Sequence, residues 1–145
     1  MTASDIELAV ADYFNVRVNL IVPNISWGMF LHECDLLIIT KNNYAYEVEI
    51  KTSKSDLIAD QKKRHNHSNK KIKKLYFAIP DDLLQYAEYI PDYAGIVVIG
   101  IDKKAKMVRQ AQDTGNYKFT AEEKYNVARL GAMRIWNLKK KLDTS

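Results

Sequence analysis

Cysteine and histidine are scarce in this chain of 145 residues, which has one cysteine, Cys34, and three histidines. A single cysteine cannot form a disulfide within the chain, and the scattered histidines do not have the spacing of a zinc site. We therefore expect neither a disulfide framework nor a structural zinc. Cys34 precedes the acid Asp35 in a β-rich run and alternates away from it, which favours a buried core thiol over a nucleophile.

Long apolar runs are also missing. No stretch approaches the roughly 18 apolar residues of a membrane helix, and the first residues lack the basic start and apolar core of a signal peptide. We expect no membrane association and a cytoplasmic location. The chain has no repeat and no Pro/Gly/Ser-rich linker, so its length predicts one domain over residues 1–145. The sequence leaves the oligomeric state open, a homodimer included.

Basic residues are unevenly distributed along the chain, although the net charge is only +4. The segment from Gln61 to Pro80 contains no acid. Its seven lysines and arginines are Lys62, Lys63, Arg64, Lys70, Lys71, Lys73 and Lys74. Such a block is usually a solvated helix face and loop, but it can also lay positive charge along a phosphate backbone.

Hydrophobic periodicity predicts alternating helices and strands. Several strand-like runs are apolar at both parities, which is typical of a sheet covered on both faces and favours an α/β fold. The expected order is a helix from Ser4 or Asp5 to Phe14, a strand Arg17–Val22, an irregular segment Pro23–His32, strands Asp35–Thr40 and Tyr44–Lys51, a helix from Lys54 to His67 or Ser68, a strand Leu75–Ile79, a helix after Pro80, a strand Gly95–Gly100, an edge strand Met107–Ala111 and a helix from Thr120 to Leu138 or beyond.

The two central strands form a hairpin whose loop length decides which residues meet. Lys41–Asn43 is turn material, because asparagine tolerates the left-handed conformation that a three-residue loop needs. A loop of that length places Asp35 opposite Glu49, with Cβ atoms about 5 Å apart. A two-residue loop would instead place Asp35 opposite Ile50, on the other face of the sheet.

Strand alternation places Glu47, Glu49 and Lys51 on one face. Two opposed carboxylates repel each other, and a hard cation such as Mg²⁺ or Mn²⁺ would offset that repulsion. Glu47 is the less suitable ligand because the same register places it opposite an apolar residue. In the alternative interpretation Glu33 pairs with Lys51 across the hairpin, while the opposed acids are solvated surface charges.

With this order of elements, the chain resembles the PD-(D/E)XK nucleases over roughly residues 4 to 80. A tighter resemblance, to the MmcB-like branch of bacterial DNA-repair proteins and related phage-borne proteins, extends to about residue 100. It rests on the E-x-K of Glu49 and Lys51, the following S-x-x-D-hydrophobic run that begins at Ser53, the run Tyr76–Pro80 and the run Ala94–Val98. The resemblance implies a restriction-endonuclease-like core, a central mixed β-sheet flanked by helices in the order αβββαβ, with a further strand and a C-terminal helix.

The resemblance also implies roles for individual residues. Asp35 and Glu49 match the metal-binding acids, and Ile50 matches the position whose backbone carbonyl reaches the metal. Lys51 matches the lysine that orients or helps to deprotonate the attacking water. Glu7 matches an extra acid that some branches supply from the first helix. Cys34 replaces the proline of the motif's name, at a position that varies.

These residues together predict a nuclease dependent on Mg²⁺ or Mn²⁺ that hydrolyses DNA phosphodiester bonds in DNA repair, recombination or phage DNA metabolism. Because Lys51 lies beside two carboxylates, it should stay protonated and act by orienting water rather than as a base. The alternative is a catalytically inactive module on the same fold that binds nucleic acid through the basic block or needs a partner protein.

Overall fold

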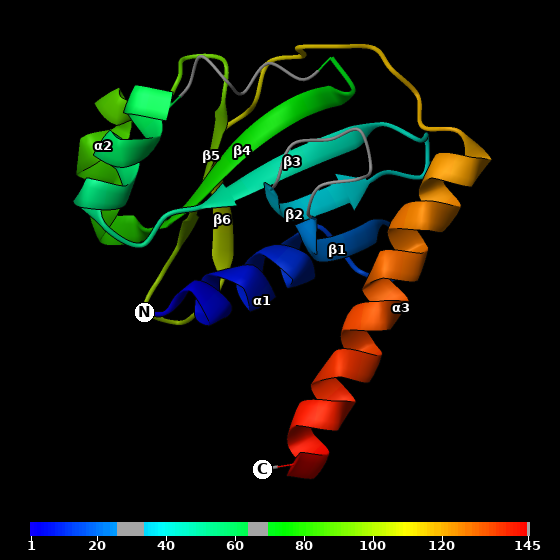
Figure 1. Ribbon diagram of the computed structural model, residues 1–145. Helices are drawn as coiled ribbons and strands as arrows, with labels where there is room; N and C mark the ends of the chain where they lie inside the picture. Colours follow the sequence, from blue (N-terminus) through cyan, green and yellow to red (C-terminus); the bar gives the residue numbers. More distant parts are fainter. Residues whose placement is uncertain (26–33, 64–69, 145) are drawn as a thin grey trace.

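The structure is a computed structural model that describes residues 1–25, 34–63 and 70–144. Its centre is an open six-stranded mixed sheet in which the strands lie side by side in sequence order (Figure 1). The strands are β1 (Leu20–Ile25), β2 (Cys34–Ile39), β3 (Ala45–Ile50), β4 (Ile72–Pro80), β5 (Gly95–Ile99) and β6 (Ala105–Arg109). Strands β3, β4 and β5 are parallel, and the other neighbouring pairs are antiparallel.

Helices lie on both faces of this sheet. They are α1 (Ala3–Tyr13), α2 (Lys54–Lys63), the 3₁₀ segment η2 (Asp81–Tyr89) and α3 (Ala121–Thr144). The α/β class, the mixed sheet and the C-terminal helix predicted from the sequence are confirmed, and the first six elements follow the order αβββαβ. Within the described residues, no helix is both long and apolar enough to cross a membrane.

Helix α1 covers one face of the sheet. Its buried side chains Ile6, Ala9 and Val10 pack against alternate residues of the central strands, among them Val48 of β3 and Ala78 of β4. On β3 the residues that face α1 are Tyr46, Val48 and Ile50, the alternate residues opposite to the face of Glu47 and Glu49. The α1 face is therefore a continuous apolar layer.

The opposite face carries two separate apolar clusters. Near β1 and β2, Val127 of α3 packs against Val22 and Leu37. Near β4 and β5, Leu57 of α2 packs with Phe77. Strand β3 runs between the two clusters. On this face its first residue, Ala45, belongs to the cluster near β1 and β2, and the acids Glu47 and Glu49 follow it. The acids thus occupy a gap in the hydrophobic layer.

The hairpin has the register that the three-residue loop predicts. Leu36 pairs with Val48, which brings Asp35 to the level of Glu49 one residue further on. The backbone N–H of Thr40 donates to the carbonyl of Tyr44 at 2.8 Å and closes the loop. Asn43 adopts the left-handed conformation, with φ of 72°.

Residues at the start of α3 make hydrogen bonds to the hairpin loop Lys41–Asn43. The backbone N–H of Phe119 donates to the carbonyl of Asn43 at 2.8 Å, and the Lys124 ammonium donates to its side-chain oxygen at 2.8 Å. A capping box starts the helix, since Thr120 and Glu123 exchange hydrogen bonds of 3.1 and 3.0 Å. The Lys71 ammonium, at the start of β4, donates to Glu123 at 2.8 Å.

Glu123 gives an acid-sensitive link between α3 and the sheet. Burial favours its neutral form, but hydrogen bonds from Lys71, the Thr120 backbone and Tyr117 outweigh burial and lower the pKa of Glu123 to about 2. A lowered pKa stabilises the fold above the ordinary value near 4.5, and the contribution is lost as the pH falls towards 2.

We therefore expect Glu123→Gln to lower the free energy of unfolding by about 1–2 kcal/mol at neutral pH, and by progressively less below pH 4.5. Urea unfolding of both proteins across that range measures the difference. Glu122→Gln is the control, since Glu122 is an exposed acid in the same helical turn. A difference that does not shrink at low pH would contradict this role.

Several boundaries differ from the sequence-based expectation. Thr2, not Ser4 or Asp5, caps α1, and Asp5 completes the capping box. Strand β1 begins at Leu20 rather than Arg17, because Asn15 takes a positive φ of 66° and the next residues form a turn. Pro23 lies within β1, where an edge strand tolerates a missing N–H.

The later strands are also displaced. Strand β4 begins at Ile72, three residues before the predicted start, and β6 spans Ala105–Arg109 rather than Met107–Ala111. Helix α2 begins at Lys54 as predicted and is described to Lys63, so its expected end near His67 lies outside the described residues. The expected irregular segment Pro23–His32 also lies outside them from residue 26 on.

Candidate active site

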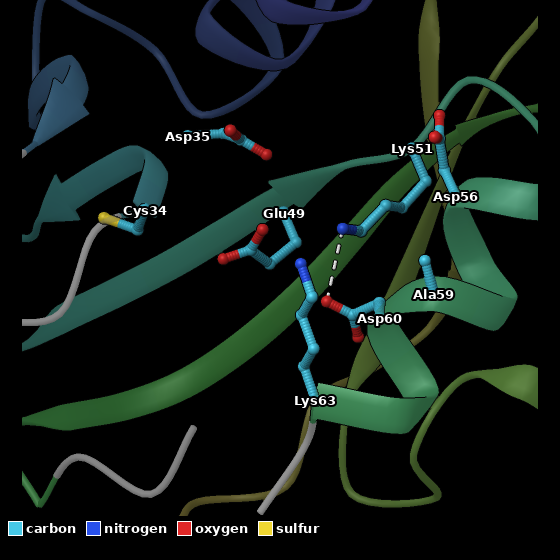
Figure 2. A pocket seen from close by; sticks show the side chains of 8 residues that line it. All are labelled: Cys34, Asp35, Glu49, Lys51, Asp56, Ala59, Asp60 and Lys63. Carbon is cyan, nitrogen blue, oxygen red and sulfur yellow. Dashed lines mark ion pairs between the residues drawn. The ribbon is translucent and has the colours of Figure 1, made fainter. Parts of the chain in front are cut away.

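A cavity of about 360 Å³ opens between α2 and the end of the β2–β3 hairpin. The three predicted catalytic residues line it together, and Figure 2 shows their side chains directed towards a common space. The lining residues are Cys34, Asp35, Glu49, Lys51, Asp56, Ala59, Asp60 and Lys63. Cys34 is 4% exposed, so the expected buried thiol is confirmed. Its expected orientation away from Asp35 is wrong, because Cys34 lies in the apolar cluster of Leu37 and Ile39 and lines the same cavity as Asp35.

Asp35 is held in place by the neighbouring strand. Its carboxylate Oδ2 accepts a hydrogen bond of 2.7 Å from the backbone N–H of Ile50. This bond ties Asp35 directly to Ile50, the residue predicted to supply a carbonyl ligand. Asp35 is half-buried and Glu49 is 7% exposed, so both acids line the cavity rather than an open surface.

The acids of β3 are protonated more readily than ordinary carboxylates. Burial, the hydrogen bond with Glu47 and the charges of Glu47 and Asp35 raise the pKa of Glu49. Burial also raises the pKa of Glu47, which is 2% exposed, and the charges of Asp35 and Asp60 add to it. The end of β3 beside the cavity therefore concentrates buried carboxyl groups that an ordinary sheet would avoid.

This donor set fits a hard divalent cation. Asp35 and Glu49 offer carboxylate oxygens from adjacent strands, and oxygen is the donor that Mg²⁺ and Mn²⁺ prefer. A cation held there would offset the repulsion that raises the pKa of Glu49. In residues 1–25, 34–63 and 70–144, no three His, Cys, Asp or Glu side chains are grouped closely enough to hold a metal. The predicted ligand set has two side chains and one backbone oxygen.

Lys51 projects from the end of β3 towards α2. Its Nζ lies 3.2 Å from Oδ1 of Asp60, whose side chain is 5% exposed (Figure 2). The alternative pairing of Lys51 with Glu33 lies outside the described residues. The other half of that alternative is wrong for Glu49, which is buried because α2 and the hairpin enclose it.

Helix α2 presents a polar face to the cavity. The Ser53 hydroxyl caps the helix by accepting a hydrogen bond of 3.2 Å from the backbone N–H of Asp56. The Asp56 carboxylate accepts hydrogen bonds from the backbone N–H and the hydroxyl of Thr52. Asp56, Asp60 and Lys63 follow at spacings of four and three, so they lie on one side of the helix. Leu57 lies on the buried side.

Sequence reasoning did not select Asp60 as a site residue. The signal was present, since Asp60 lies at helical spacing from Asp56 and Lys63 in the helix that follows the E-x-K strand. What the sequence did not show is that Asp60 is buried rather than solvated. Its burial depends on α2 packing against the sheet, through Leu57 and the apolar cluster near β4 and β5.

Glu7, the extra acid predicted from the first helix, lies within electrostatic reach of this site. Burial and then the Asp35 charge raise the pKa of Glu7. Glu7 does not line the cavity itself. Glu7 on α1 and Asp35 on β2 are nevertheless close enough for their charges to interact.

The structure separates the predicted phosphate-binding block into two groups. Lys63 lines the cavity, and Lys62 is exposed beside it on α2. Lys71 pairs with Glu123, and the Nζ atoms of Lys73 and Lys74 lie 3.9 and 3.8 Å from Asp113. Lys70 is exposed in the turn before β4, and Arg64 lies outside the described residues.

The second group is distant from the acids because of the parallel pairing of β3 and β4. Glu49 pairs with Phe77, four residues after Lys73. At about 3.3 Å per residue, Lys73 lies roughly 13 Å back along the strand. Lys71, Lys73 and Lys74 therefore belong to the opposite end of the sheet, where Glu123 pairs with Lys71 and Asp113 lies near the other two.

Comparison with known proteins gives a likeness of fold. No family model matches the sequence, and no curated protein matches it. A solved structure, described as a protein of unknown function from Silicibacter pomeroyi, superposes with a TM-score of 0.69 at 17% sequence identity. The match covers 99% of this chain and 92% of that chain. At this identity the likeness supports the α/β architecture of the whole chain.

Proposed function

We propose that this protein is a metal-dependent nuclease that hydrolyses phosphodiester bonds in DNA. One observation carries the proposal: the opposed pair Asp35 and Glu49 lines one cavity together with Lys51. Three residue types that phosphodiester hydrolysis uses thus meet at one point, although Lys51 follows Asp35 by sixteen residues in the sequence. DNA repair, recombination and phage DNA metabolism are the processes that this activity would serve.

Each residue has a distinct task in the proposed reaction. Asp35 and Glu49, with the Ile50 carbonyl, would hold Mg²⁺ or Mn²⁺. Bound there, the cation would lower the pKa of a water molecule, polarise the phosphate and offset charge on the leaving oxygen. Lys51 contributes a positive charge beside the attacked phosphate and orients the water. Lys63, at the rim of the cavity, is placed to contact a neighbouring phosphate of the DNA backbone.

The second candidate is a nucleic-acid-binding module that does not cleave. The Lys51–Asp60 ion pair favours it, because a lysine neutralised by a buried acid has less charge to offer a phosphate. The complete set of Asp35, Glu49 and Lys51 favours the nuclease. The two functions differ in whether the bound nucleic acid is cut.

Cleavage and metal binding test the proposal together. We expect the wild-type protein to cut end-labelled DNA in the presence of Mg²⁺ or Mn²⁺ and not in the presence of EDTA. Calorimetry with Mn²⁺ should give a binding heat for the wild type and none for Asp35→Ala, which should also lose cleavage. RNA in the same panel tests the choice of substrate. No heat and no cleavage with the wild-type protein would rule out the nuclease.

A further inference from the structure

Asp60 is a buried acid that lines the cavity and that the proposed reaction does not use. Its side chain is 5% exposed, and it faces the cavity from α2, one helical turn after Asp56. Burying a carboxylate costs free energy unless a charged partner compensates for it. The Lys51 ammonium, 3.2 Å from Oδ1 of Asp60, is such a partner. A buried acid facing a cavity and pairing with a candidate catalytic lysine suggests a functional role.

The surroundings of Lys51 define what Asp60 does. Lys51 extends from the strand that also carries Glu47 and Glu49, and its charge lowers the pKa of both acids, so the ammonium is within electrostatic reach of them. A flexible lysine in that position would be attracted onto the Glu49 carboxylate. It would then occupy the oxygens that a metal needs. Asp60 instead draws the ammonium towards α2.

We propose that Asp60 is a positioning residue that keeps the Lys51 ammonium off Glu49, so that Glu49 remains open to a divalent cation and Lys51 faces the substrate. The inference rests on the proposed function and adds a fourth residue to its site. Helix α2 is short and capped at its start by Ser53, so it holds the Asp60 carboxylate more rigidly than a loop would.

Mn²⁺ affinity measured by calorimetry tests the proposal without relying on cleavage. Asp60→Asn keeps the shape of the side chain and removes its charge. We expect it to weaken Mn²⁺ binding about tenfold, a change typical of directly coupled residues, because Lys51 then competes for Glu49. Adding Lys51→Ala should restore the wild-type affinity. A purely structural role for Asp60 predicts no such rescue.

Cleavage supplies the second measurement. Asp60→Asn should lower kcat at saturating Mn²⁺ with little change in KM, and the double variant should cut no more slowly than Lys51→Ala alone. Asp56→Asn is the matched control, since it removes an acid from the same helix face whose hydrogen bonds go to Thr52. It should keep Mn²⁺ affinity within about twofold, below the coupling expected for contacting residues.

The outcomes separate the two proposals. Unchanged Mn²⁺ affinity and kcat in a folded Asp60→Asn variant overturn the role of Asp60, as does a loss of affinity that Lys51→Ala fails to restore. Mn²⁺ binding by a wild-type protein that does not cleave removes the proposed reaction but leaves Asp60 to be judged by affinity. No Mn²⁺ binding by the wild type overturns both. If Asp60→Asn does not fold, Asp60→Glu, which keeps the charge, must retain the wild-type affinity.

Discussion

Replacing Lys51 with alanine is expected to slow DNA cleavage by at least about 100-fold, the scale of losing one group that stabilises developing charge. Lys51 lines the cavity together with Glu49, and its positive charge lowers the pKa of Glu49. Mn²⁺ binding should persist, because the substitution removes no carboxylate. The measurement is single-turnover cleavage of end-labelled DNA at saturating Mn²⁺, with calorimetry on the same samples.

Lys54→Ala is the control for this substitution. Lys54 lies three residues further on, with its ammonium 4.9 Å from the centre of the Tyr86 ring, and it does not line the cavity. It should therefore cleave at close to the wild-type rate. Cleavage by Lys51→Ala near the wild-type rate would remove Lys51 from the reaction, whereas a loss of Mn²⁺ binding would assign it a structural role.

Glu49→Gln is expected to change the stability of the protein in opposite directions with and without metal. In EDTA, the wild-type protein bears the cost of an acid whose pKa is raised by burial and by its neighbours Glu47 and Asp35. A raised pKa means that stability falls as the pH rises above the ordinary value of 4.5. Glutamine removes that cost, so the variant should be more stable than the wild type by about 1–3 kcal/mol at pH 8.

With Mn²⁺ the order should reverse. Binding to the folded state alone adds about 2.7 kcal/mol at a metal concentration one hundred times Kd. Glu49→Gln loses a ligand and therefore most of this gain. Thermal unfolding of the wild type and of Glu49→Gln, each in EDTA and in Mn²⁺, gives the four stabilities to be compared. Equal stability of the wild type in the two buffers would contradict metal binding at Glu49.

The stabilities in EDTA and in Mn²⁺ also show whether Glu49 serves metal binding or only the fold. A carboxylate retained only for the fold should stabilise the protein, and its removal should not help. Glu49 is 7% exposed and lies beside the still more deeply buried Glu47. A protein that becomes more stable when Glu49 is neutralised, and loses its response to Mn²⁺ as well, retains the acid for binding rather than for folding.

Most of the candidate site was predictable because it depends on local rules. Strand alternation assigned Glu49 and Lys51 to one face, and the length and composition of the Lys41–Asn43 loop set the register that brings in Asp35. Both rules act over a few neighbouring residues. Boundaries were less well predicted, since the start of β1 depends on the left-handed residue Asn15 and the turn that follows it.

Contacts between distant segments were not predictable in this way. The basic block reads as continuous in the sequence, yet Lys63 lines the cavity while Lys71 and Lys73 face acids that lie about forty to fifty residues away in the chain. Nothing local distinguishes a solvated lysine from one that pairs with Glu123. The two kinds of lysine differ only in the folded protein, where the segment that carries Asp113 and Glu123 returns beside β4.

The sequence by itself determined the hairpin, its register and the meeting of Asp35 with Glu49, because backbone alternation and turn chemistry are properties of consecutive residues. The tertiary structure decided the environment of that pair. Packing of α2 against the sheet buries Asp60 and brings it to 3.2 Å from Lys51, and the two apolar clusters on either side of β3 leave the gap that encloses the acids. Burial is a property of the whole chain, and it converts these charges from solvated groups into a candidate site.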